Sequence, residues 1–354
     1  MRAAWRPGKG SAFPGCVAFR LQALSLKLSR MHMKAAIYER YGSPSVLQLR
    51  AVPAPEPKPD QVRIAIQATT ATAACQMMRR GDTLMARVVL GAFRPRRRFR
   101  ILGIELAGTV DRVGRDVTRF KLGDRVFGFT GFGSGGYAQY VCLSENASLA
   151  PIPAGLSHEE ACSLVDGPTT SLYFLRDRAR LRAGERVAVI GASGSVGSAA
   201  VQIARHFGAR VTAVCSGRNA ELVRSLGAHD VVDYTQHDYA ARGGAYDVVF
   251  DTVGVSSFAR ARSCLADDGR YLITVGGAGL FLRDAWSRAF GRKKLVFGMS
   301  VEKKAALAEV SALVAKGALR PVVDRRYPLE EIAAAHRYVE TGRKRGNVVI
   351  TVGA

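Results

Sequence analysis

The sequence predicts an α/β protein in which a doubly wound parallel sheet follows a β-barrel-like part. Three observations predict this class. Short strand patterns separated by glycine and proline fill residues 34–164, strand and helix patterns alternate over residues 165–298, and strand character returns at the end of residues 299–354. Alternation of strands with helices implies a parallel sheet with helices on both faces, whereas short strands punctuated by glycine are typical of a compact barrel.

The strands of the first part follow from alternating apolar and polar residues. Four prolines between residues 53 and 59 exclude a helix there, because proline lacks the N–H that a helix interior needs. A turn at Leu122–Asp124 joins the last two strands. The strands expected in this part are 34–38, 61–66, 108–114 and 124–129.

The second part is punctuated by glycines that end its helices. Gly208 follows one helix pattern and Gly227 follows the next, as expected for a residue that tolerates the left-handed conformation at a helix end. The final strand is expected to return to the first part, which would make that part discontinuous. The expected strands are 186–190, 210–215, 230–233, 246–250, 269–274 and 347–352, and the expected helices are 195–207, 219–226, 303–316 and 329–341.

The composition is that of a folded intracellular protein. Of the 354 residues, 48% are hydrophobic and 23% are charged, and no apolar stretch approaches the roughly 20 residues that cross a bilayer. None of the six cysteines forms a C-x-x-C pair, which excludes a zinc finger and indicates reduced thiols. We therefore expect a cytoplasmic protein without a membrane span.

The net charge of +23 is concentrated in two places. Residues 1–33 contain basic residues and no acid, and three interpretations stay open: a disordered tail translated from an upstream start codon, a transit peptide that would direct the protein to mitochondria, or a secretory signal. The second place is Arg94–Arg100, which holds five arginines. This cluster either meets an anionic partner or reflects composition alone. Because no nucleic-acid motif accompanies it, we expect no nucleic-acid partner.

A glycine-rich loop follows the strand at 186–190 and opens the helix at 195–207. In this setting, a turn without side chains lets backbone N–H groups approach a pyrophosphate, and the helix N-terminus adds about half a positive charge. The last glycine lets the helix pack closely on the sheet. We expect a dinucleotide site formed by Gly191, Ala192, Ser193, Gly194, Ser195, Val196 and Gly197.

The end of the next strand decides between the two nicotinamide dinucleotides. An NAD site usually places an acid at this point to hold the ribose diol. Here the strand ends at Cys215 and is followed by Ser216 and Arg218, with no acid. A hydroxyl and a guanidinium suit a 2′-phosphate, so the expected cofactor is NADPH. The alternative is that Arg218 is an ordinary solvated residue at a helix start.

The order of the motifs resembles that of the medium-chain dehydrogenase/reductase superfamily. The resemblance covers roughly residues 34–354. It implies a GroES-like catalytic domain at 34–164, a Rossmann NADPH-binding domain at 165–298, and a return to the catalytic domain at 299–354. The motifs that carry it are Gly103–Gly114, Lys121–Val126, Gly136–Tyr140, the loop at 191–197 and Asp251–Gly254.

One position of the first motif separates this chain from the zinc-dependent members. Those members carry a histidine ligand where this sequence has Ile104, and a lone thiol at Cys75 does not replace the three protein ligands of a catalytic zinc. The sequence therefore resembles the zinc-free quinone oxidoreductases and enoyl reductases, and we expect no metal site. Glu105, which is retained from the motif, is expected to be structural.

The resemblance also implies roles for individual residues. Thr72 and Cys75 stand where relatives often carry Asn and Asp, and they are the candidates for a catalytic role. Tyr234 is either a cofactor contact or a half-buried strand end. The residues placed at the cofactor are Ser216, Arg218 and Tyr234 for the 2′-phosphate, Thr170 for the nicotinamide side, and Val275, Gly276 and Asn347 as further candidates.

Without zinc, no Lewis acid stabilises an alkoxide, so simple alcohol oxidation is not expected. The resemblance implies a homodimer that transfers hydride from NADPH to a quinone or an α,β-unsaturated carbonyl compound. Two alternatives stay open. One is an enoyl-thioester reductase whose Arg94–Arg100 cluster meets a phosphorylated carrier such as CoA. The other is a weakly catalytic NADPH-binding regulator associated with RNA or with a membrane.

Overall fold

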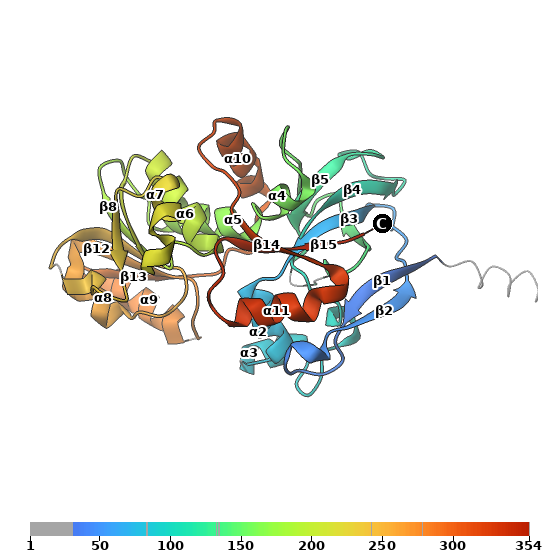
Figure 1. Ribbon diagram of the computed structural model, residues 1–354, viewed down its shortest axis with the longest axis horizontal. Coiled ribbons are helices and arrows are strands. Elements are labelled where there is room, and N and C mark those ends of the chain that lie inside the picture. Colours follow the sequence, from blue (N-terminus) through green and yellow to red (C-terminus); the bar gives the residue numbers. More distant parts are fainter. Residues whose placement is uncertain are drawn as a thin grey trace, which may run out of the picture.

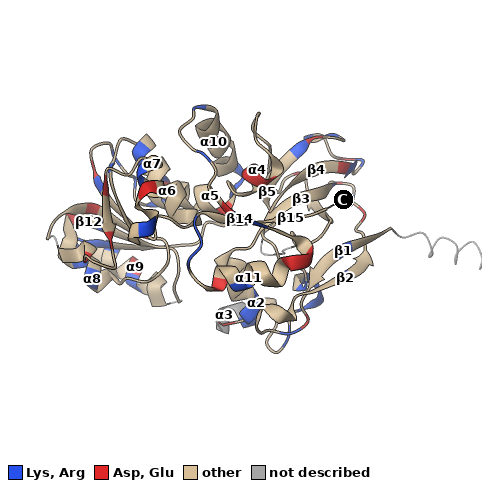
Figure 2. Ribbon diagram, in the orientation of Figure 1, with Lys and Arg blue, Asp and Glu red and all other residues tan. Residues whose placement is uncertain are grey.

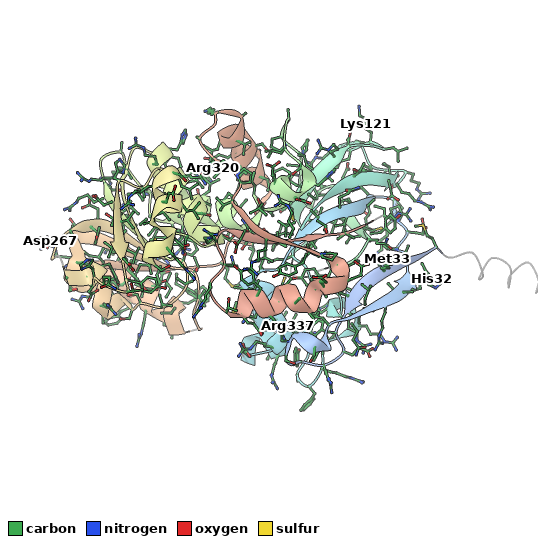
Figure 3. All side chains as sticks on the ribbon, in the orientation of Figure 1. His32, Met33, Lys121, Asp267, Arg320 and Arg337 are labelled. Atoms are coloured by element: carbon green, nitrogen blue, oxygen red, sulfur yellow. The ribbon has the colours of Figure 1, made fainter. Side chains whose placement is uncertain are left out.

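The computed structural model describes residues 31–353 except for positions 83, 132, 134, 242 and 278. Its two lobes lie side by side along the long axis of the molecule (Figure 1). Figure 3 labels Asp267 at the outer end of one lobe and His32 with Met33 at the far side of the other. Strand β1 begins at His32, so the last residues of the expected extension belong to the fold. Residues 1–30 lie outside the described residues, and the three interpretations of the extension stay predictions.

The lobe on the right of Figure 1 is built around a seven-stranded sheet with the order β14-β15-β3-β4-β5-β7, and β6 pairs with β3 beside this path. The ladders are antiparallel except for β14 with β15. β1 and β2 form a separate antiparallel pair. The strands are β1 (His32–Ile37), β2 (Gln48–Pro53), β3 (Gln61–Thr70), β4 (Glu105–Val113), β5 (Arg125–Phe129), β6 (Tyr140–Ser144), β7 (Ser148–Pro151), β14 (Val323–Pro328) and β15 (Asn347–Thr351).

The last strand of the chain completes a sheet that begins at Gln61. β15 lies antiparallel to β3, with Val349 opposite Thr70 and Ile350 opposite Thr69. The apolar side chains at 348–350 are fully buried in the main core. The C-terminal residues are therefore part of the interior of this lobe.

Two helices of this lobe begin with side-chain caps. Thr72 Oγ1 accepts a hydrogen bond from Cys75 N at the start of α2, and this helix ends at Gly81, which has a left-handed φ of 62°. Ser157 and Glu160 form a capping box at the start of α4. The helices of this lobe are α2 (Ala73–Arg80), α3 (Leu84–Leu90), α4 (His158–Cys162), α10 (Lys304–Ala315) and α11 (Ile332–Glu340), and α5 (Asp166–Leu172) leads to the other lobe and packs on its first helix.

The lobe on the left of Figure 1 holds a six-stranded, wholly parallel sheet with the order β10-β9-β8-β11-β12-β13. One of its two central strands, β8, is buried on both faces, because Val187 and Val189 belong to one apolar cluster and Ala188 and Ile190 belong to the other. The strands are β8 (Arg186–Ile190), β9 (Arg210–Cys215), β10 (Asp230–Asp233), β11 (Tyr246–Asp251), β12 (Leu265–Ile273) and β13 (Lys294–Phe297), and the helices are α6 (Ser195–His206), α7 (Ala220–Ser225), α8 (Phe258–Cys264) and α9 (Gly279–Phe290).

The predicted fold class is confirmed. In Figure 1, α6 and α7 lie on one side of the parallel sheet and α8 and α9 on the other, and the apolar side chains that the two helix pairs pack on the sheet belong to different clusters. Within the described residues, no helix combines the length and the apolar character needed to cross a bilayer. Lys and Arg are spread over both lobes in the view of Figure 2 and do not form one stripe there.

Candidate active site

A cleft of about 780 Å³ lies between the two lobes. This volume is in the range of clefts that hold small ligands and cofactors. The lining residues come from segments that are far apart in the sequence, within 71–76, 190–196, 214–219, 252–256 and 339–347, together with Asp166, Tyr234, Tyr239 and Arg260.

The position of the cleft follows from the strand order of the parallel sheet. β8 and β11 are neighbours, and from this pair the chain continues outward in opposite directions, through β9 and β10 on one side and β12 and β13 on the other. The cleft lies at the carboxyl ends of β8, β9 and β11. Ligands of open α/β sheets bind at such a topological switch point.

Two glycines in the loop between β8 and α6 are required by the local geometry. Gly191 has a φ of +75°, and a Cβ atom there would lie 2.6 Å from Val253 Cγ2. A Cβ atom on Gly197 would lie 2.1 Å from the carbonyl oxygen of Gly191, so the first turn of α6 packs directly on the loop. Gly194 precedes α6 without a side-chain cap, which leaves first-turn N–H groups for a ligand at the cleft wall.

Asn347 ties this loop to the other lobe. Its Oδ1 accepts a hydrogen bond from Ser195 Oγ at 2.6 Å, and its Nδ2 donates to Ser163 O at 3.0 Å. Beside it, Gly346 N donates to Ser193 O at 2.7 Å. The amide of Asn347 is therefore occupied in positioning the loop, and a direct contact with a cofactor stays a prediction.

Ser216, Arg218 and Tyr234 line the part of the cleft that follows β9 and β10, where Tyr234 N donates to Cys215 O at 3.2 Å, and we call this part the outer end. Tyr234 is 63% exposed, and Arg218 is exposed with no ion-pair partner within the described part of the chain. Arg260 lines the same end and pairs with Asp238 at 2.9 Å. This end of the cleft therefore presents hydroxyl groups and positive charge.

Asn219 is a buried residue at the outer end of the cleft, and the sequence analysis did not identify it. Its Nδ2 donates to Ser193 Oγ at 3.0 Å and to Ser216 Oγ at 3.2 Å, which links the glycine loop to the end of β9. Its Oδ1 is buried without a hydrogen-bond partner among the described residues. In the sequence, Asn219 looked like the first residue of a helix, but its side chain makes no cap.

The wall at 252–256 is held in place by Asp251, which is fully buried. Its Oδ1 accepts hydrogen bonds from Val253 N at 3.1 Å and Gly254 N at 2.8 Å. Its Oδ2 accepts from Ser256 N at 2.8 Å and from Tyr271 OH at 3.0 Å. The acid of the Asp251–Gly254 motif thus shapes the cleft without lining it.

The structure brings most of the predicted residues to the cleft. Ala192 and Gly197 pack inside the loop, whereas Val275 and Gly276 follow β12 and are exposed beyond the wall. The predicted residues that line the cleft are Thr72, Gly191, Ser193, Gly194, Ser195, Val196, Ser216, Arg218, Tyr234 and Asn347, and those that do not are Cys75, Thr170, Ala192, Gly197, Val275 and Gly276.

Of the two predicted catalytic residues, only Thr72 lines the cleft. Cys75 is fully buried behind it, and burial raises the pKa of its thiol. The backbone N–H of Cys75 donates to Thr72 Oγ1 at 3.1 Å. This position does not support a direct contact between Cys75 and a substrate, because the thiol is closed off from the cleft.

We call the part of the cleft that is lined by Thr72, Asp166 and Lys344 its inner end, and a buried cluster of charged groups adjoins it. Glu105 accepts hydrogen bonds from Asp166 N at 2.5 Å and from Thr70 Oγ1. Lys303, 1% exposed, donates from Nζ to Asp166 Oδ1 at 2.8 Å and to Thr170 Oγ1 at 3.3 Å. Burial and then the negative charge of Asp166 raise the pKa of Glu105 to about 7. Thr170 contacts this cluster, so its predicted contact with the nicotinamide side stays a prediction.

Lys344 lines the inner end and was missed by the sequence analysis. Its half-buried side chain donates from Nζ to Gly346 O at 2.7 Å. Burial lowers the pKa of Lys344 to about 8, and the carboxylate of Glu105 opposes this shift. In the sequence, Lys344 stands between two arginines and looks like part of a solvated basic run.

The wall at 339–344 is fixed by a buried network. Arg79, fully buried, pairs with Glu340, which lines the cleft, and donates to Gly42 O. Its Nε donates to His336 Nδ1 at 3.4 Å, and His336 Nε2 lies 3.0 Å from Tyr137 OH. Burial and then the positive charge of Arg79 lower the pKa of His336 to about 3, so the ring is neutral.

Two further sequence features lie apart from the cleft. Ile104, at the position of the expected zinc ligand, is 3% exposed and packs in the main core. Within the described ranges of 31–353, no three His, Cys, Asp or Glu side chains gather as a metal-binding group. The arginines of Arg94–Arg100 do not line the cleft and follow Phe93, which is 94% exposed.

Two family models match the chain. The model described as an alcohol dehydrogenase GroES-like domain matches residues 58–154, and the model described as a zinc-binding dehydrogenase matches residues 226–350. The chain is 32% identical over 330 residues to a quinone oxidoreductase of Pseudomonas aeruginosa, a match that covers 88% of this chain and 98% of that protein.

Solved structures agree with these matches. The quinone oxidoreductase from Coxiella burnetii has a TM-score of 0.82 at 27% identity and covers 91% of this chain and 100% of its own. The CurK enoyl reductase has the same fold, with a TM-score of 0.79 at 23% identity over 91% of this chain and 99% of its own. From its fold, its motifs and these relatives, the chain belongs to the medium-chain dehydrogenase/reductase superfamily, among the relatives of the quinone oxidoreductases.

Proposed function

We propose that this oxidoreductase transfers hydride from NADPH to a quinone or an α,β-unsaturated carbonyl compound without a metal ion. The observation that carries the proposal is the composition of the cleft. Its outer end presents Ser216 and Arg218, and its inner end presents Thr72 and Lys344. Ile104 stands where a zinc ligand would be needed.

Three features of the cleft support NADPH as the cofactor. The glycine loop leaves a cradle at the N-terminus of α6, which suits a pyrophosphate. Arg218 and Ser216 suit a 2′-phosphate, and the acid at the end of β10, Asp233, is turned to Thr235 and does not line the cleft. Asn219 Oδ1 is a buried acceptor that a ribose hydroxyl would satisfy.

A bound NADPH would supply the hydride at the inner end of the cleft, and the chain's own residues would position the acceptor and supply the proton. Thr72 Oγ1 accepts from a backbone N–H and retains a hydroxyl hydrogen to donate to a substrate carbonyl. Lys344, with a pKa of about 8, is mostly protonated at neutral pH and is well matched to proton donation. The carboxylates of Glu105 and Asp166 favour its charged form.

Quinones and conjugated carbonyl compounds suit this cleft, because they accept hydride without a Lewis acid on oxygen. The name of the Pseudomonas aeruginosa relative, a quinone oxidoreductase, supports a quinone for this chain as well. The enoyl-thioester alternative relied on Arg94–Arg100, and this cluster lies outside the lining of the cleft. We therefore place quinones and free enones before carrier-bound substrates.

The test follows the absorbance of NADPH with the purified full-length protein, an aromatic ortho-quinone and a zinc chelator. We expect rapid oxidation of NADPH, slow oxidation of NADH and no effect of the chelator. A rate that falls with the chelator would contradict the argument from Ile104, and equal rates with both dinucleotides would contradict the argument from Arg218. A CoA thioester offered beside the matching free enone separates the two classes of conjugated substrate.

The remaining partner predictions are kept as proposals. A homodimer and a cytoplasmic location follow from the resemblance and the cysteine pattern, and a mitochondrial location remains the alternative if residues 1–33 are a transit peptide. We propose no nucleic-acid partner, because the basic residues are spread over both lobes in Figure 2. Gel filtration at several protein concentrations would test the dimer directly.

A further inference from the structure

The segment at 87–98, which we call the arginine loop, presents an apolar tip next to a row of arginines. Ala92 and Phe93 form the tip and are both exposed. Phe93 is 94% exposed, the highest value of any exposed large apolar side chain in the described part of the chain. Val88 and Val89, at the end of α3, are 61% and 43% exposed. The arginines that follow the tip are Arg94, Arg96, Arg97 and Arg98, all of which are exposed.

The backbone of the loop holds the tip outward. Gly91 has a φ of +134°, and a Cβ atom there would lie 2.2 Å from Arg94 O, so the turn closes tightly on itself. Arg96 N donates to Leu90 O at 2.8 Å and joins the two sides of the turn. Tyr41 OH donates to Gly91 O at 2.6 Å and ties the turn to the rest of the lobe. The side chains that anchor the turn from both sides are Leu90, Pro95 and Phe99, all of which are buried.

The positive charge of this loop is not neutralised by nearby acids. Between Asp82 and Glu105 the sequence contains six arginines and no acid. Arg100 pairs with Glu39 at 2.8 Å, whereas the other five have no ion-pair partner among the residues that the structure describes. Asp82, just before the segment, already pairs with Arg80 at 3.0 Å. Five guanidinium groups are therefore available to an external anion.

The charged and apolar side chains of the loop form one continuous surface. Arg96 Nη2 lies 3.5 Å from Val88 O, so this guanidinium reaches back to the exposed end of α3. The guanidinium of Arg98 lies over the ring of Phe99, 4.5 Å from its centre. An apolar centre with a charged border is typical of an interaction surface.

We propose that the arginine loop docks on the surface of a bilayer that contains anionic lipids. The ring of Phe93 would lie at the boundary between headgroups and acyl chains, where burial of apolar surface is favourable. The arginines beside it would extend to the lipid phosphates, as expected for a cluster of four or more basic residues. The loop would lie in the interface without crossing it, because the buried anchors hold its base in the fold.

A bilayer fits this surface better than single-stranded RNA or a second copy of the chain. Proteins that bind single strands stack bases on aromatic residues within a basic groove, whereas Phe93 stands at a tip that no neighbour covers, and Val88 and Val89 have no ring for stacking. Contact between two copies at this loop would bring the unpaired arginines of both chains together, which is unfavourable. Anionic lipids neutralise the same arginines.

The loop is connected to one wall of the cleft. α3 packs on α2, and the two helices lie next to each other at the lower edge of the right lobe in Figure 1. The first residues of α2, within 71–76, line the cleft, and a helix of eight residues is about 12 Å long. Docking would therefore bring this wall of the cleft close to the membrane. The inference does not rest on the proposed activity, because a lipid surface would bind the loop whatever the cleft accepts.

Matched pairs of substitutions in the full-length protein locate the docking surface. We would measure co-sedimentation with vesicles of equimolar phosphatidylcholine and phosphatidylglycerol. Arg94→Gln with Arg97→Gln should weaken binding by about thirtyfold, which corresponds to about 1 kcal/mol for each arginine. The matched control is Arg180→Gln with Arg182→Gln, which removes two exposed arginines of the other lobe that have no ion-pair partner in the described structure. The control should bind like the parent, and equal Tm values establish that both folds are unchanged.

A tryptophan at the tip reports its depth. The chain has two tryptophans, Trp5 and Trp286, so Phe93→Trp combined with Trp5→Phe and Trp286→Phe gives a chain with a single tryptophan at the loop. We expect a water-like emission in the free protein, a blue shift on the anionic vesicles, and quenching when their acyl chains are brominated. Neutral phosphatidylcholine vesicles should change the emission little, and added salt should reduce the blue shift on anionic vesicles.

Three results would overturn the proposal. The first is an emission of the introduced tryptophan that stays water-like on every kind of vesicle. The second is equal weakening of vesicle binding by the two pairs of substitutions, which would assign binding to the overall charge of the protein. The third is unchanged vesicle binding by Arg94→Gln with Arg97→Gln together with a loss of single-stranded RNA binding, which would make the loop a nucleic-acid site.

Discussion

Replacement of Arg218 by alanine should change the choice between the two dinucleotides. Arg218 is exposed at the outer end of the cleft and has no carboxylate partner in the described structure, so its guanidinium is available to a 2′-phosphate. A charge-assisted hydrogen bond contributes about 1.5–3 kcal/mol, and each 1.4 kcal/mol is about tenfold in affinity. Because solvent screens an exposed contact, we expect the lower end of this range, about a tenfold loss for NADPH.

The neighbouring Arg260 should not compensate for the lost affinity for NADPH. Arg260 lines the same end of the cleft, but its guanidinium is bound to Asp238 at 2.9 Å. The assay is the Kd of NADPH and of NADH, measured by titration of the dinucleotide fluorescence, together with both KM values. The matched control is Arg224→Ala, an exposed arginine on α7 outside the lining of the cleft. Equal weakening of NADPH and NADH by Arg218→Ala, or no change in either, would refute the reasoning.

Three further predictions concern the loop, the proton and the fold. Gly197→Ala places a Cβ atom 2.1 Å from Gly191 O, so it should lower the free energy of unfolding in urea by about 1–3 kcal/mol. It should also weaken the binding of NADPH and of NADH by the same factor. An unchanged midpoint of urea unfolding would contradict this prediction. Lys344 loses its proton as pH rises through its pKa of about 8, so the rate of enone reduction should fall in this pH range. Lys344→Met should be slower than the parent below pH 8 and should not show this decline. A pH profile unchanged by the substitution would rule out Lys344 as the proton donor. Arg79→Met removes the buried guanidinium that bonds to Glu340 and to Gly42 O, while the Glu340 carboxylate left behind still reaches solvent, so the free energy of unfolding should fall by about 1–3 kcal/mol; a loss below about 0.5 kcal/mol would show that the network contributes little.

The sequence was sufficient for features that depend on local patterns. Strands and helices around the glycine loop were predictable because their apolar periodicity and terminal glycines are local. The same local reasoning selected Ser216 and Arg218 one strand further along, and both line the cleft, although their contact with a 2′-phosphate stays a prediction.

Other site residues depend on contacts between segments that are distant in the chain. Lys344 belongs to the cleft only because β15 returns to β3, and Glu340 is fixed by Arg79 from the far end of the sequence. Asn219 reaches Ser193 across the nucleotide loop instead of capping its own helix. No local pattern distinguishes these residues from solvated ones.

Helix α9 shows a different limit of sequence reasoning. An apolar stripe at helical spacing predicts that the stripe is buried, yet here Leu282, Trp286 and Phe290 are exposed. Leu280 in the first turn packs on the apolar cluster of the sheet, and the polar Asp284 and Ser287 are buried on the face opposite the stripe. Their bonds to Arg178 and Leu295 come from elements that are distant in sequence or follow the helix, and they decide which face is turned inward. Periodicity identifies a helix with two faces, but only the tertiary contacts show which face is left outside.

The return of β15 to β3 also affects how the chain is made. The parallel sheet of the left lobe uses strands from residues 186–297 only, so all of it can leave the ribosome and fold before the rest is synthesised. In the other sheet, the edge of residues 68–70 of β3 that faces β15 must stay open until residues 349–351 arrive, and an open strand edge is prone to aggregation. The hydrogen bond between Ser195 and Asn347 closes at the same moment. The nucleotide crevice is therefore completed only after nearly the whole chain has been synthesised, and a chain truncated before Asn347 would retain the glycine loop without the partner that positions it.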